Sequence, residues 1–415
     1  MHRRFVKYFP LVFCSLLCSG KAHGAIYECA FNDKLGHALR LNVPDDLAVV
    51  RGILIWGNGA GQDSRDQATN PELVAFADSI GFCVLACGHW SNFSDPQAVE
   101  FRAFLNGIEY LAQRSGHLEL RNAPWLPIGH SNGGQMSYAL TVLRPDRVIA
   151  MVVSKGGYYI SGRPTSAALH TPGLLIAGEA DLAQRRQAIH ELFTINRRRG
   201  ALWAWVEEEG TDHSERDSNE LIRPFIAECV ARRLPADADP RKGPVKLREL
   251  TEASGWLLNA DSYKSGWAEI AAYPNYHDDR SAADWLPSER IAMIFRAFAS
   301  YHKATMKTGI DGAAGSIAVK GSIVGYHVAP PAAPWRNVEF FEGNTSLGTF
   351  TAAATTLAVQ KRADTPGYLA FHGVVTFADG TRRTTLPRRV FVRAAGAATS
   401  NTAISGERSA KAVAP

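Results

Sequence analysis

The chain has 415 residues, enough for two to three domains, and its 46% hydrophobic and 20% charged residues exclude wholesale disorder, collagen-like repeats and a multi-span membrane protein. The formal net charge of +5 is concentrated at the start, because four basic residues and no acid precede residue 25, and the rest of the chain has 41 basic against 40 acidic residues. Such a balance gives no reason to expect nucleic acid or an anionic membrane surface as a partner.

Residues 1–24 have the order of a secretory signal peptide. Arg3, Arg4 and Lys7 precede an apolar run from residue 8 to 18, and small residues follow at Ala22 and Gly24. The run is about half of the ~20 residues that a membrane-spanning helix needs. We therefore expect cleavage after Gly24, a secreted or periplasmic protein and no membrane insertion once the signal is removed; a buried N-terminal helix is the alternative.

Removal of this segment leaves four cysteines, Cys29, Cys83, Cys87 and Cys229. An even number in an oxidising compartment favours disulfide bonds over metal or redox chemistry. Cys83 and Cys87 belong to one predicted strand, and four residues of strand span ~13 Å, too far for a bridge between them. The pairing of the cysteines stays open.

Residues 25–232 alternate predicted strands with predicted helices. The strands are expected at 47–56, 82–87, 124–128, 148–154, 173–177 and 202–206, and the helices at 71–80, 96–114, 135–143, 182–199 and 221–233. This alternation predicts an α/β domain with a mostly parallel sheet flanked by helices.

The pattern changes twice beyond this domain. Residues 233–314 contain a polar, proline-bearing linker, an aromatic run from Trp256 to Trp285 and a predicted helix at 288–303. We expect the aromatic residues to pack this extension onto the core; a lid or a sugar platform is the alternative. Residues 315–395 predict a small all-β sandwich of short alternating strands, and 396–415, without periodicity, predict a disordered tail.

The pentapeptide Gly-His-Ser-Asn-Gly at 129–133 matches the pattern G-x-S-x-G. The pattern alone is weak, but here it joins a predicted strand to a predicted helix, which is the setting of a nucleophile elbow. Ser131 then lies at a helix N-terminus, where the amide of Asn132 can donate to a developing oxyanion. A helix cap with glycines at a tight turn is the alternative interpretation.

A serine nucleophile needs a base, and the base needs an orienting acid. In the elbow architecture the chain order is serine, then carboxylate, then histidine. Asp181 lies just past the predicted strand 173–177, with Glu179 as its rival, and His213 lies in the loop after 202–206. His190 falls in a helix and is expected to be a surface or packing residue.

The second oxyanion donor is expected in the glycine-rich loop at 56–61, from the backbone amide of Asn58 or Gly59. A phosphate-binding loop is excluded there because no Lys-Ser/Thr follows. Trp90 and Tyr158 follow other strand ends at the same sheet edge and are candidates for substrate contact; packing in the core is the alternative. His277, Asp278 and Asp279 predict a solvated turn, and no metal or cofactor is expected.

Together these residues resemble the α/β-hydrolase superfamily. Trp-Gly-Asn-Gly followed by Gly-His-Ser-Asn-Gly-Gly is most similar to its dienelactone-hydrolase and polyester-hydrolase-like branch of serine esterases. The resemblance implies a triad of Ser131, His213 and Asp181 that hydrolyses an ester-bearing small molecule or polymer through an acyl-enzyme. The dienelactone hydrolases themselves differ in having a cysteine nucleophile.

The C-terminal sequence resembles bacterial immunoglobulin-like modules of secreted enzymes, at 338–343, 347–348 and 378–380. This resemblance implies a spacer, with polysaccharide contact as the alternative. The chain as a whole predicts a secreted serine esterase without a cofactor. A lipase or serine peptidase on the same fold, and a binding or adhesion protein on an inactive hydrolase scaffold, are the alternatives.

Overall fold

The computed structural model describes residues 24–395 except 46, 91–92, 94–98, 260–261, 266, 302, 304–305 and 314–315. Residues 1–23 of the expected signal peptide and the expected tail at 396–415 lie outside the described residues. Within the described part of the chain, no helix combines the length and the apolar character needed to cross a membrane.

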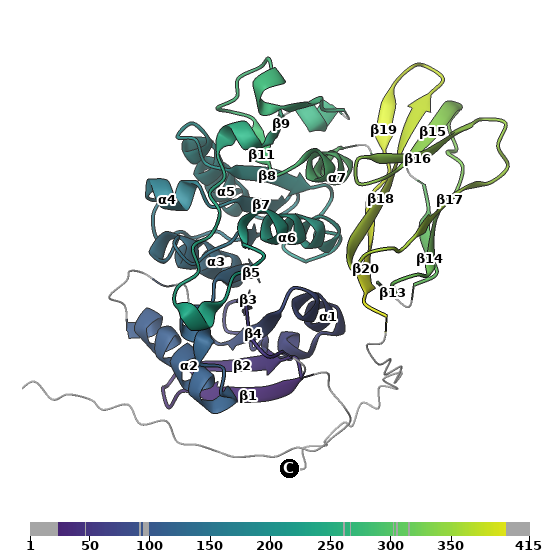
Figure 1. Cartoon of the computed structure of the whole chain (residues 1–415). Coiled ribbons are helices and arrows are strands. Elements are labelled where there is room, and N and C mark those ends of the chain that lie inside the picture. Colours follow the sequence, from purple (N-terminus) through teal and green to yellow (C-terminus); the bar gives the residue numbers. More distant parts are fainter. Residues whose placement is uncertain are drawn as a thin grey trace, which may run out of the picture.

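An eight-stranded sheet forms the centre of the N-terminal half, in the order β1-β2-β4-β3-β5-β6-β7-β8 (Figure 1). Its strands are β1 (Ala25–Ala30), β2 (Ala38–Val43), β3 (Gly52–Gly57), β4 (Phe82–Gly88), β5 (Trp125–His130), β6 (Met151–Ser154), β7 (Gly173–Gly178) and β8 (Trp203–Glu208). The pairs from β4 to β8 are parallel, whereas β2 is antiparallel to both β1 and β4. The sheet is therefore mixed, because two strands absent from the sequence prediction extend the six predicted parallel ones.

Helices cover both faces of this sheet (Figure 1). They are α1 (Pro71–Ser79), α2 (Val99–Ser115), α3 (Asn132–Leu143), the single turn α4 (Ser166–Leu169), α5 (Ala183–Arg197) and α6 (Asn219–Arg233). Short 3-10 helices span Arg65–Thr69, Leu118–Arg121, Pro240–Lys242, Glu252–Ser254, Ser262–Ser265 and Tyr273–Asn275. The predicted helices are present, although that at 96–114 is described only from Val99.

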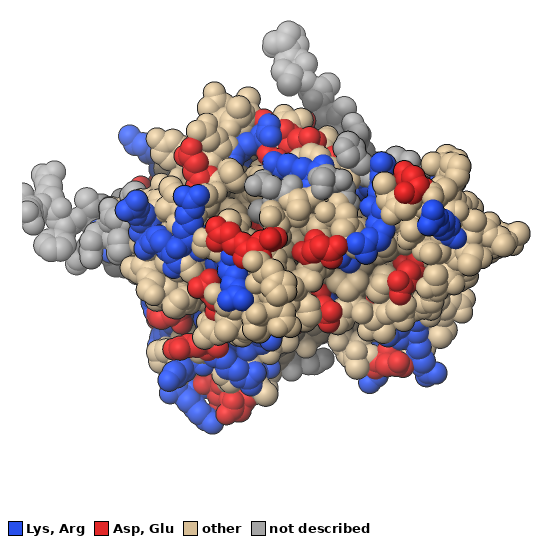
Figure 2. Space-filling model, turned by 90° about the horizontal axis from the view of Figure 1, so that it is seen from above, with Lys and Arg blue, Asp and Glu red and all other residues tan. Residues whose placement is uncertain are grey.

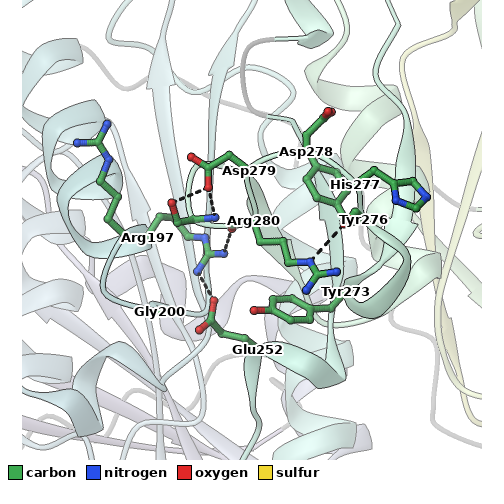
Figure 3. A pocket seen from close by; sticks show the side chains of 11 residues that line it. Arg197, Gly200, Glu252, Tyr273, Tyr276, His277, Asp278, Asp279 and Arg280 are labelled. Carbon is green, nitrogen blue, oxygen red and sulfur yellow. Dashed lines mark hydrogen bonds and ion pairs between the residues drawn. The ribbon is translucent and has the colours of Figure 1, made fainter.

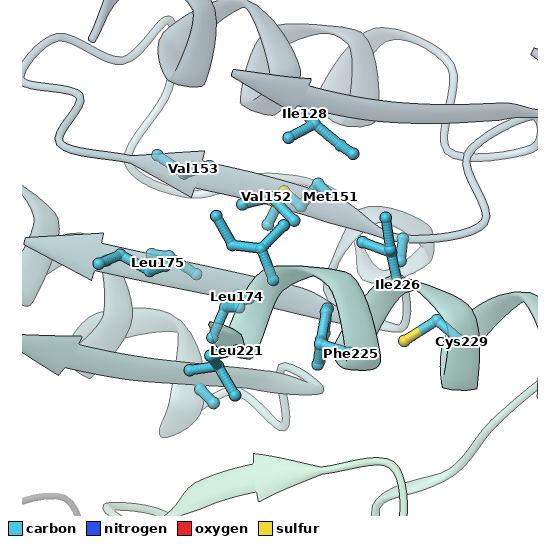
Figure 4. Packing of buried hydrophobic residues seen from close by; sticks show 14 of the residues in the cluster. Ile128, Met151, Val152, Val153, Leu174, Leu175, Leu221, Phe225, Ile226 and Cys229 are labelled. Carbon is cyan, nitrogen blue, oxygen red and sulfur yellow. The ribbon is translucent and has the colours of Figure 1, made fainter. Parts of the chain in front are cut away.

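Side-chain alternation along the central strands supplies an apolar layer on each face. In β3, Leu54 belongs to the cluster that includes α1 and α6, and Ile55 to the cluster that includes α2. Figure 4 shows residues of α6, among them Leu221, Phe225 and Ile226, lying against side chains of β5, β6 and β7. This double-sided burial fixes the strand ends on which the functional residues lie.

The expectation of disulfide bonds is wrong for the described residues, because Cys29, Cys83, Cys87 and Cys229 are all free and buried. Cys29 and Cys87 lie in one row across the sheet, but Leu39 of β2 pairs with both of them. Two strand spacings separate them by about 9.5 Å, beyond the reach of a disulfide. Cys229 lies in the apolar cluster of the opposite face.

Residues beyond α6 form a small antiparallel sheet and one helix against the core. The sheet has the order β10 (Ile270–Ala272), β9 (Trp256–Leu258), β11 (Asp284–Leu286), and α7 (Glu289–Ala299) follows it. Trp285 and Tyr263 are fully buried, so they pack the extension onto the core. Asp284 accepts a hydrogen bond of 2.7 Å from the amide of Trp205 in β8, which covers the outer edge of the large sheet.

Two further sheets form the C-terminal part and share one apolar core that contains Tyr326, Phe340 and Phe371. The first has the order β12 (Thr308–Asp311), β14 (Ile323–Val328), β17 (Leu357–Arg362). The second has the order β13 (Ile317–Val319), β20 (Arg388–Arg393), β18 (Gly367–Phe377), β15 (Trp335–Glu342), β16 (Thr345–Thr351), with β19 (Arg382–Thr384) paired to β18. We call this two-layered unit the C-terminal module; because β12 pairs with β14, it begins before the expected residue 315.

The C-terminal module is docked on the α/β domain. The ring of Phe76 in α1 lies 5.4 Å from that of Tyr368 and 6.2 Å from that of Phe391. Beside these rings, Arg389 forms an ion pair of 2.9 Å with Glu72. Strands β18 and β20 therefore use one face for their own sandwich and the other for this interface. The role of a spacer stays a prediction.

Charged side chains of both signs are interspersed over the face seen in Figure 2. No large area of a single sign covers this face, as the near balance of 41 basic and 40 acidic residues after position 24 predicts.

Candidate active site

Ser131 occupies a sharp turn between β5 and α3. Its backbone has φ 55° and ψ −122°, an unfavourable conformation for a residue with a side chain. The turn is held by a hydrogen bond of 2.7 Å from the amide of Ser131 to the carbonyl of Ser154, at the end of β6. The sequence prediction of a strand, a tight turn and a helix at this position agrees with the structure.

Three glycines make this turn sterically possible. A Cβ atom on Gly129 would lie 2.2 Å from the backbone of Gly133, and one on Gly133 would lie 2.3 Å from the carbonyl oxygen of Gly57. A Cβ atom on Gly57 would in turn lie 2.8 Å from Gly133. Strand β5, helix α3 and the end of β3 thus approach one another at distances that only glycine permits.

Ser131, His213 and Asp181 come together at the carboxyl edge of the sheet. The Nε2 atom of His213 lies 2.9 Å from the Oγ atom of Ser131, and its Nδ1 atom lies 2.7 Å from Oδ2 of Asp181. Ser131 and His213 are half-buried, whereas Asp181 is buried. This is the geometry in which a carboxylate orients an imidazole that can accept the serine proton.

The structure separates Asp181 from its rival Glu179. Glu179 turns away and accepts a hydrogen bond of 2.7 Å from the amide of Gly210. Burial acts to raise the pKa of Asp181, but hydrogen bonds from His213, the Leu182 amide and Arg185 outweigh it and hold this pKa below its usual value. Asp181 is therefore ionised at neutral pH, as an orienting acid must be.

Two backbone contacts bring the His213 loop to Asp181. Gly178 ends β7, and a Cβ atom there would lie 2.1 Å from the carbonyl oxygen of Asp212. Two residues on, the amide of Ala180 donates a hydrogen bond of 2.9 Å to the carbonyl of Thr211. The loop therefore runs directly along the turn that presents Asp181.

The glycine-rich loop after β3 lies beside the N-terminus of α3. The side-chain amide of Asn132 donates to the carbonyls of Asn58, at 3.3 Å, and Trp90, at 2.8 Å. Asn58 is fully buried, and its amide nitrogen donates to the carbonyls of Gly59 and Trp90. The side chain of Asn58 thus fixes the loop beside the first turn of α3.

The amide of Asn132 is the first of α3, so it has no intrahelical acceptor, and the helix dipole makes its surroundings favourable for negative charge. It follows Ser131 directly. Asn132 therefore lies beside the loop of Asn58 and Gly59, and their role as oxyanion donors stays a prediction.

The expectation that the Trp90 side chain contacts substrate is wrong. Its indole is 1% exposed, donates a hydrogen bond of 2.9 Å to the carbonyl of Ala38 and stacks on His37. The residue before it, His89, has φ 62°, which turns the chain at the strand end and directs the indole into the core. Tyr158, by contrast, lies in the segment between β6 and α4 and is 79% exposed.

A buried ion pair that was not among the sequence predictions lies beside the site. Lys155 follows β6 directly, is fully buried and donates 2.8 Å to Glu208, the last residue of β8. Lys155 also donates to the carbonyl of Ser214, next to His213. An available sequence signal was a lysine placed directly after the apolar strand 148–154, where its ammonium needs an acidic partner.

Positive backbone φ marks the same sheet edge. Among the described non-glycine residues, only His89, Ser131 and Lys155 have positive φ, and they follow or end β4, β5 and β6. Strained backbone of this kind is concentrated at functional sites.

His130, next to Ser131, lies 4.9 Å from His213, measured between ring centres. Burial, together with the charges of His213 and Lys155, lowers the pKa of His130 to about 4. His130 is therefore neutral at pH 7.

A separate cavity of about 490 Å³ lies near the C-terminal end of α5, where Arg197, Glu252 and Tyr273 contribute to its wall (Figure 3). Helix α5 starts beside Asp181 and has 15 residues, so about 22 Å separate its two ends. Arg197 already donates to the carbonyls of Ala283, Ala201 and Arg280. The cavity is therefore distant from Ser131, and its buried cation already has several protein acceptors.

His277, Asp278 and Asp279 lie in this wall, and Asp279 accepts hydrogen bonds from the backbone and hydroxyl of Ser281. Within the described ranges, no cluster of three or more His, Cys, Asp or Glu side chains has the arrangement of a metal site.

No protein-family model and no curated protein matches the sequence. Among solved structures, a ferulic acid esterase is similar at 12% identity, with 47% of this chain and 93% of that chain covered and a TM-score of 0.37. An acetyl xylan esterase from Aspergillus awamori is similar at 12% identity, with 41% and 77% covered and a TM-score of 0.33. Fibronectin(III)-like modules from Clostridium thermocellum share 22% identity, with 21% and 94% covered and a TM-score of 0.18.

Proposed function

We propose that this protein is a serine hydrolase that cleaves carboxylic esters through an acyl-enzyme. The observation that carries the proposal is the continuous chain of hydrogen bonds from Asp181 through His213 to Ser131, with 2.7 Å and 2.9 Å between the bonded atoms. Its support is the strained turn of Ser131 and the hydrogen bond that joins Asn132, at the start of α3, to the loop after β3.

In this mechanism His213 takes the proton of Ser131 as the serine oxygen attacks the ester carbonyl. Asp181 holds the imidazole with Nδ1 protonated and stabilises the imidazolium that forms. The amides of Asn132 and of the loop at Asn58 and Gly59 bind the oxyanion. His213 then protonates the leaving alcohol and activates the water that hydrolyses the acyl-enzyme.

We place the substrate over the ends of β6 and β7. Two large apolar side chains are exposed there, Tyr158 at 79% and Leu182, the residue after Asp181, at 58%. Exposed apolar groups beside a nucleophile favour an ester with an apolar acyl or alcohol part. A Tyr158→Ala variant is expected to raise KM for p-nitrophenyl butyrate more than for p-nitrophenyl acetate.

The proposed activity is tested with protein lacking residues 1–24 and p-nitrophenyl acetate, butyrate and longer esters. Ser131→Ala and His213→Ala should abolish hydrolysis, whereas His190→Ala, which changes an exposed histidine of α5, should retain it. Equal hydrolysis by wild type and Ser131→Ala would overturn the proposal. A peptide p-nitroanilide in parallel separates esterase from peptidase activity.

We also propose that residues 1–24 direct export and are removed. Expression of the full chain in a bacterial host with a periplasm tests this: the exported protein should begin at Ala25 by N-terminal sequencing. Retention of Met1 in a cytoplasmic product would overturn this proposal and leave the esterase proposal untouched.

A further inference from the structure

The loop that carries His213 runs from Glu209 to Ser218, between β8 and α6, and contains no apolar side chain. Only Thr211 and Ser218 within it are buried. A cavity of about 130 Å³ lies against the loop, with Phe298 in its wall. Apolar packing therefore cannot be what holds this loop in place.

Polar contacts hold the loop instead, and several of them run to one buried ion pair. Glu208 Oε1 accepts a hydrogen bond of 2.7 Å from the amide of Asp217, and Oε2 accepts one of 2.8 Å from the hydroxyl of Ser218. Lys155, 2.8 Å from Glu208, also donates to the carbonyl of Ser214. The segment 214–218, which follows His213, is thus bonded to the ion pair at both of its ends.

The same strand end also holds the serine. The carbonyl of Ser154 accepts the amide of Ser131 at 2.7 Å, and the next residue, Lys155, donates its own amide to Ile176 of β7, also at 2.7 Å. The end of β6 is therefore bonded both to the turn of Ser131 and to the loop of His213. A small movement here changes the distance between the two reacting groups.

We propose that Lys155 and Glu208 are positioning residues that set the distance between His213 and Ser131. The proposal rests on the proposed esterase function. A buried ion pair contributes little to stability compared with apolar residues of similar size, and Lys155 has the additional cost of φ 52°. Control of the His213 loop accounts for a charged, strained and fully buried residue at this point.

The test is the double variant Lys155→Met/Glu208→Gln, in which neither charge is left unpaired. We expect kcat for p-nitrophenyl acetate to fall roughly 10- to 100-fold with KM little changed, because misplacement by about 1 Å has such an effect. The matched control is Arg197→Met/Glu252→Gln, which removes the ion pair of another fully buried cation at the far end of α5. This control should lower the melting temperature and leave kcat near wild type.

A second variant covers the case in which the double variant does not fold. Glu208→Asp keeps the charge but withdraws the carboxylate by one methylene group, so it should fold and lower kcat about 10-fold. The far-downfield proton resonance of His213 Nδ1 should broaden or shift in both loop variants and stay in place in the Arg197 control.

Wild-type kcat and an unchanged His213 resonance in the loop variants would overturn the positioning role while the esterase proposal stands. Equal fractional losses of kcat in the loop variants and in the Arg197 control would also overturn it, since they would indicate general destabilisation. If the wild type hydrolyses no ester, the proposed function fails, and the resonance alone decides whether the pair positions His213.

Discussion

The close approach of α3 to the loop after β3 predicts the effect of one added methyl group. In Gly133→Ala the new Cβ atom would lie 2.3 Å from the carbonyl oxygen of Gly57, against an ordinary contact of 3.4 Å or more. The backbone at Gly57 must therefore recede by about 1 Å. We expect that movement to shift the loop of Asn58 and Gly59 away from Asn132 at the start of α3.

We expect this displacement to weaken oxyanion binding. Loss of one such donor or a misplacement of about 1 Å lowers kcat by roughly 100-fold, equivalent to about 2.7 kcal/mol of activation free energy. The assay is steady-state hydrolysis of p-nitrophenyl acetate, with KM expected to change little. The downfield resonance of His213 Nδ1 should persist in Gly133→Ala, because Asp181 is not displaced.

Gly162→Ala is the matched control, because a Cβ atom at Gly162 has no neighbour within 4 Å. It should leave kcat and the melting temperature unchanged. A Gly133→Ala protein with wild-type kcat and a normal melting temperature would refute the reasoning, since the methyl group would then have been accommodated without moving the oxyanion amides.

Three further changes have expected outcomes. Asp181→Asn should lower kcat by about 10⁴-fold with the fold retained, because an amide favours the wrong imidazole tautomer, whereas Glu179→Gln should have almost no effect. Burial, followed by the charge of Arg296, lowers the pKa of His372 to about 3. The neutral imidazole therefore contributes its full stabilisation above pH 6.5, and this contribution is lost as the pH falls toward 3. At pH 5 the unfolded chain gains about 2 kcal/mol by protonating this residue, so His372→Phe should raise the free energy of unfolding by about 2 kcal/mol more at pH 5 than at pH 8, measured with urea. Arg388→Gln, which removes an ion pair of 3.2 Å to Asp217, should lower kcat about 2- to 5-fold at an almost constant melting temperature.

Each of these has its own contrary result. A large kcat loss in Glu179→Gln with little loss in Asp181→Asn would transfer the acid role to Glu179. A parallel pH dependence of unfolding in wild type and His372→Phe would show that folding does not lower the pKa of His372. Arg362→Gln, whose ion pair with Asp364 is exposed and distant from the His213 loop, is the control for Arg388→Gln; equal kcat in all three proteins would show that the ion pair of Arg388 does not affect catalysis.

The site was predictable where a local pattern determines local backbone. The pattern G-x-S-x-G between a strand and a helix specifies the turn of Ser131, and the chain order then leaves few choices for Asp181 and His213. Trp90 shows the limit of this reasoning. Its place after β4 was predicted correctly, but the direction of its side chain depends on the positive φ of His89, which the sequence does not reveal.

The lysine after the strand at 148–154 indicates that Lys155 needs an acidic partner, but the sequence does not show that this partner is Glu208. Glu207, Glu208 and Glu209 form an acidic run that in sequence resembles a solvated surface segment. In the structure Glu207 and Glu208 are buried. Glu207 forms an ion pair with Arg186, and Glu208 forms one with Lys155. Pairing between residues about 50 positions apart leaves no periodic signal in the sequence. The order of the strands, which places β2 between Cys29 and Cys87, leaves none either.

The cations that surround this acidic run show that residues beyond 232 contact the strand end and the loop that present His213. Glu207 pairs with Lys264 and Glu209 with Lys303, both from the extension beyond α6. From the C-terminal module, Arg388 reaches Asp217 in the loop of His213. These pairs are partly exposed and individually weak, but all of them join the strand end or the loop that presents His213. The extension and the module thus support the active-site side of the sheet from outside, and a protein shortened to residues 25–232 would lack these contacts and expose the apolar interface around Phe76.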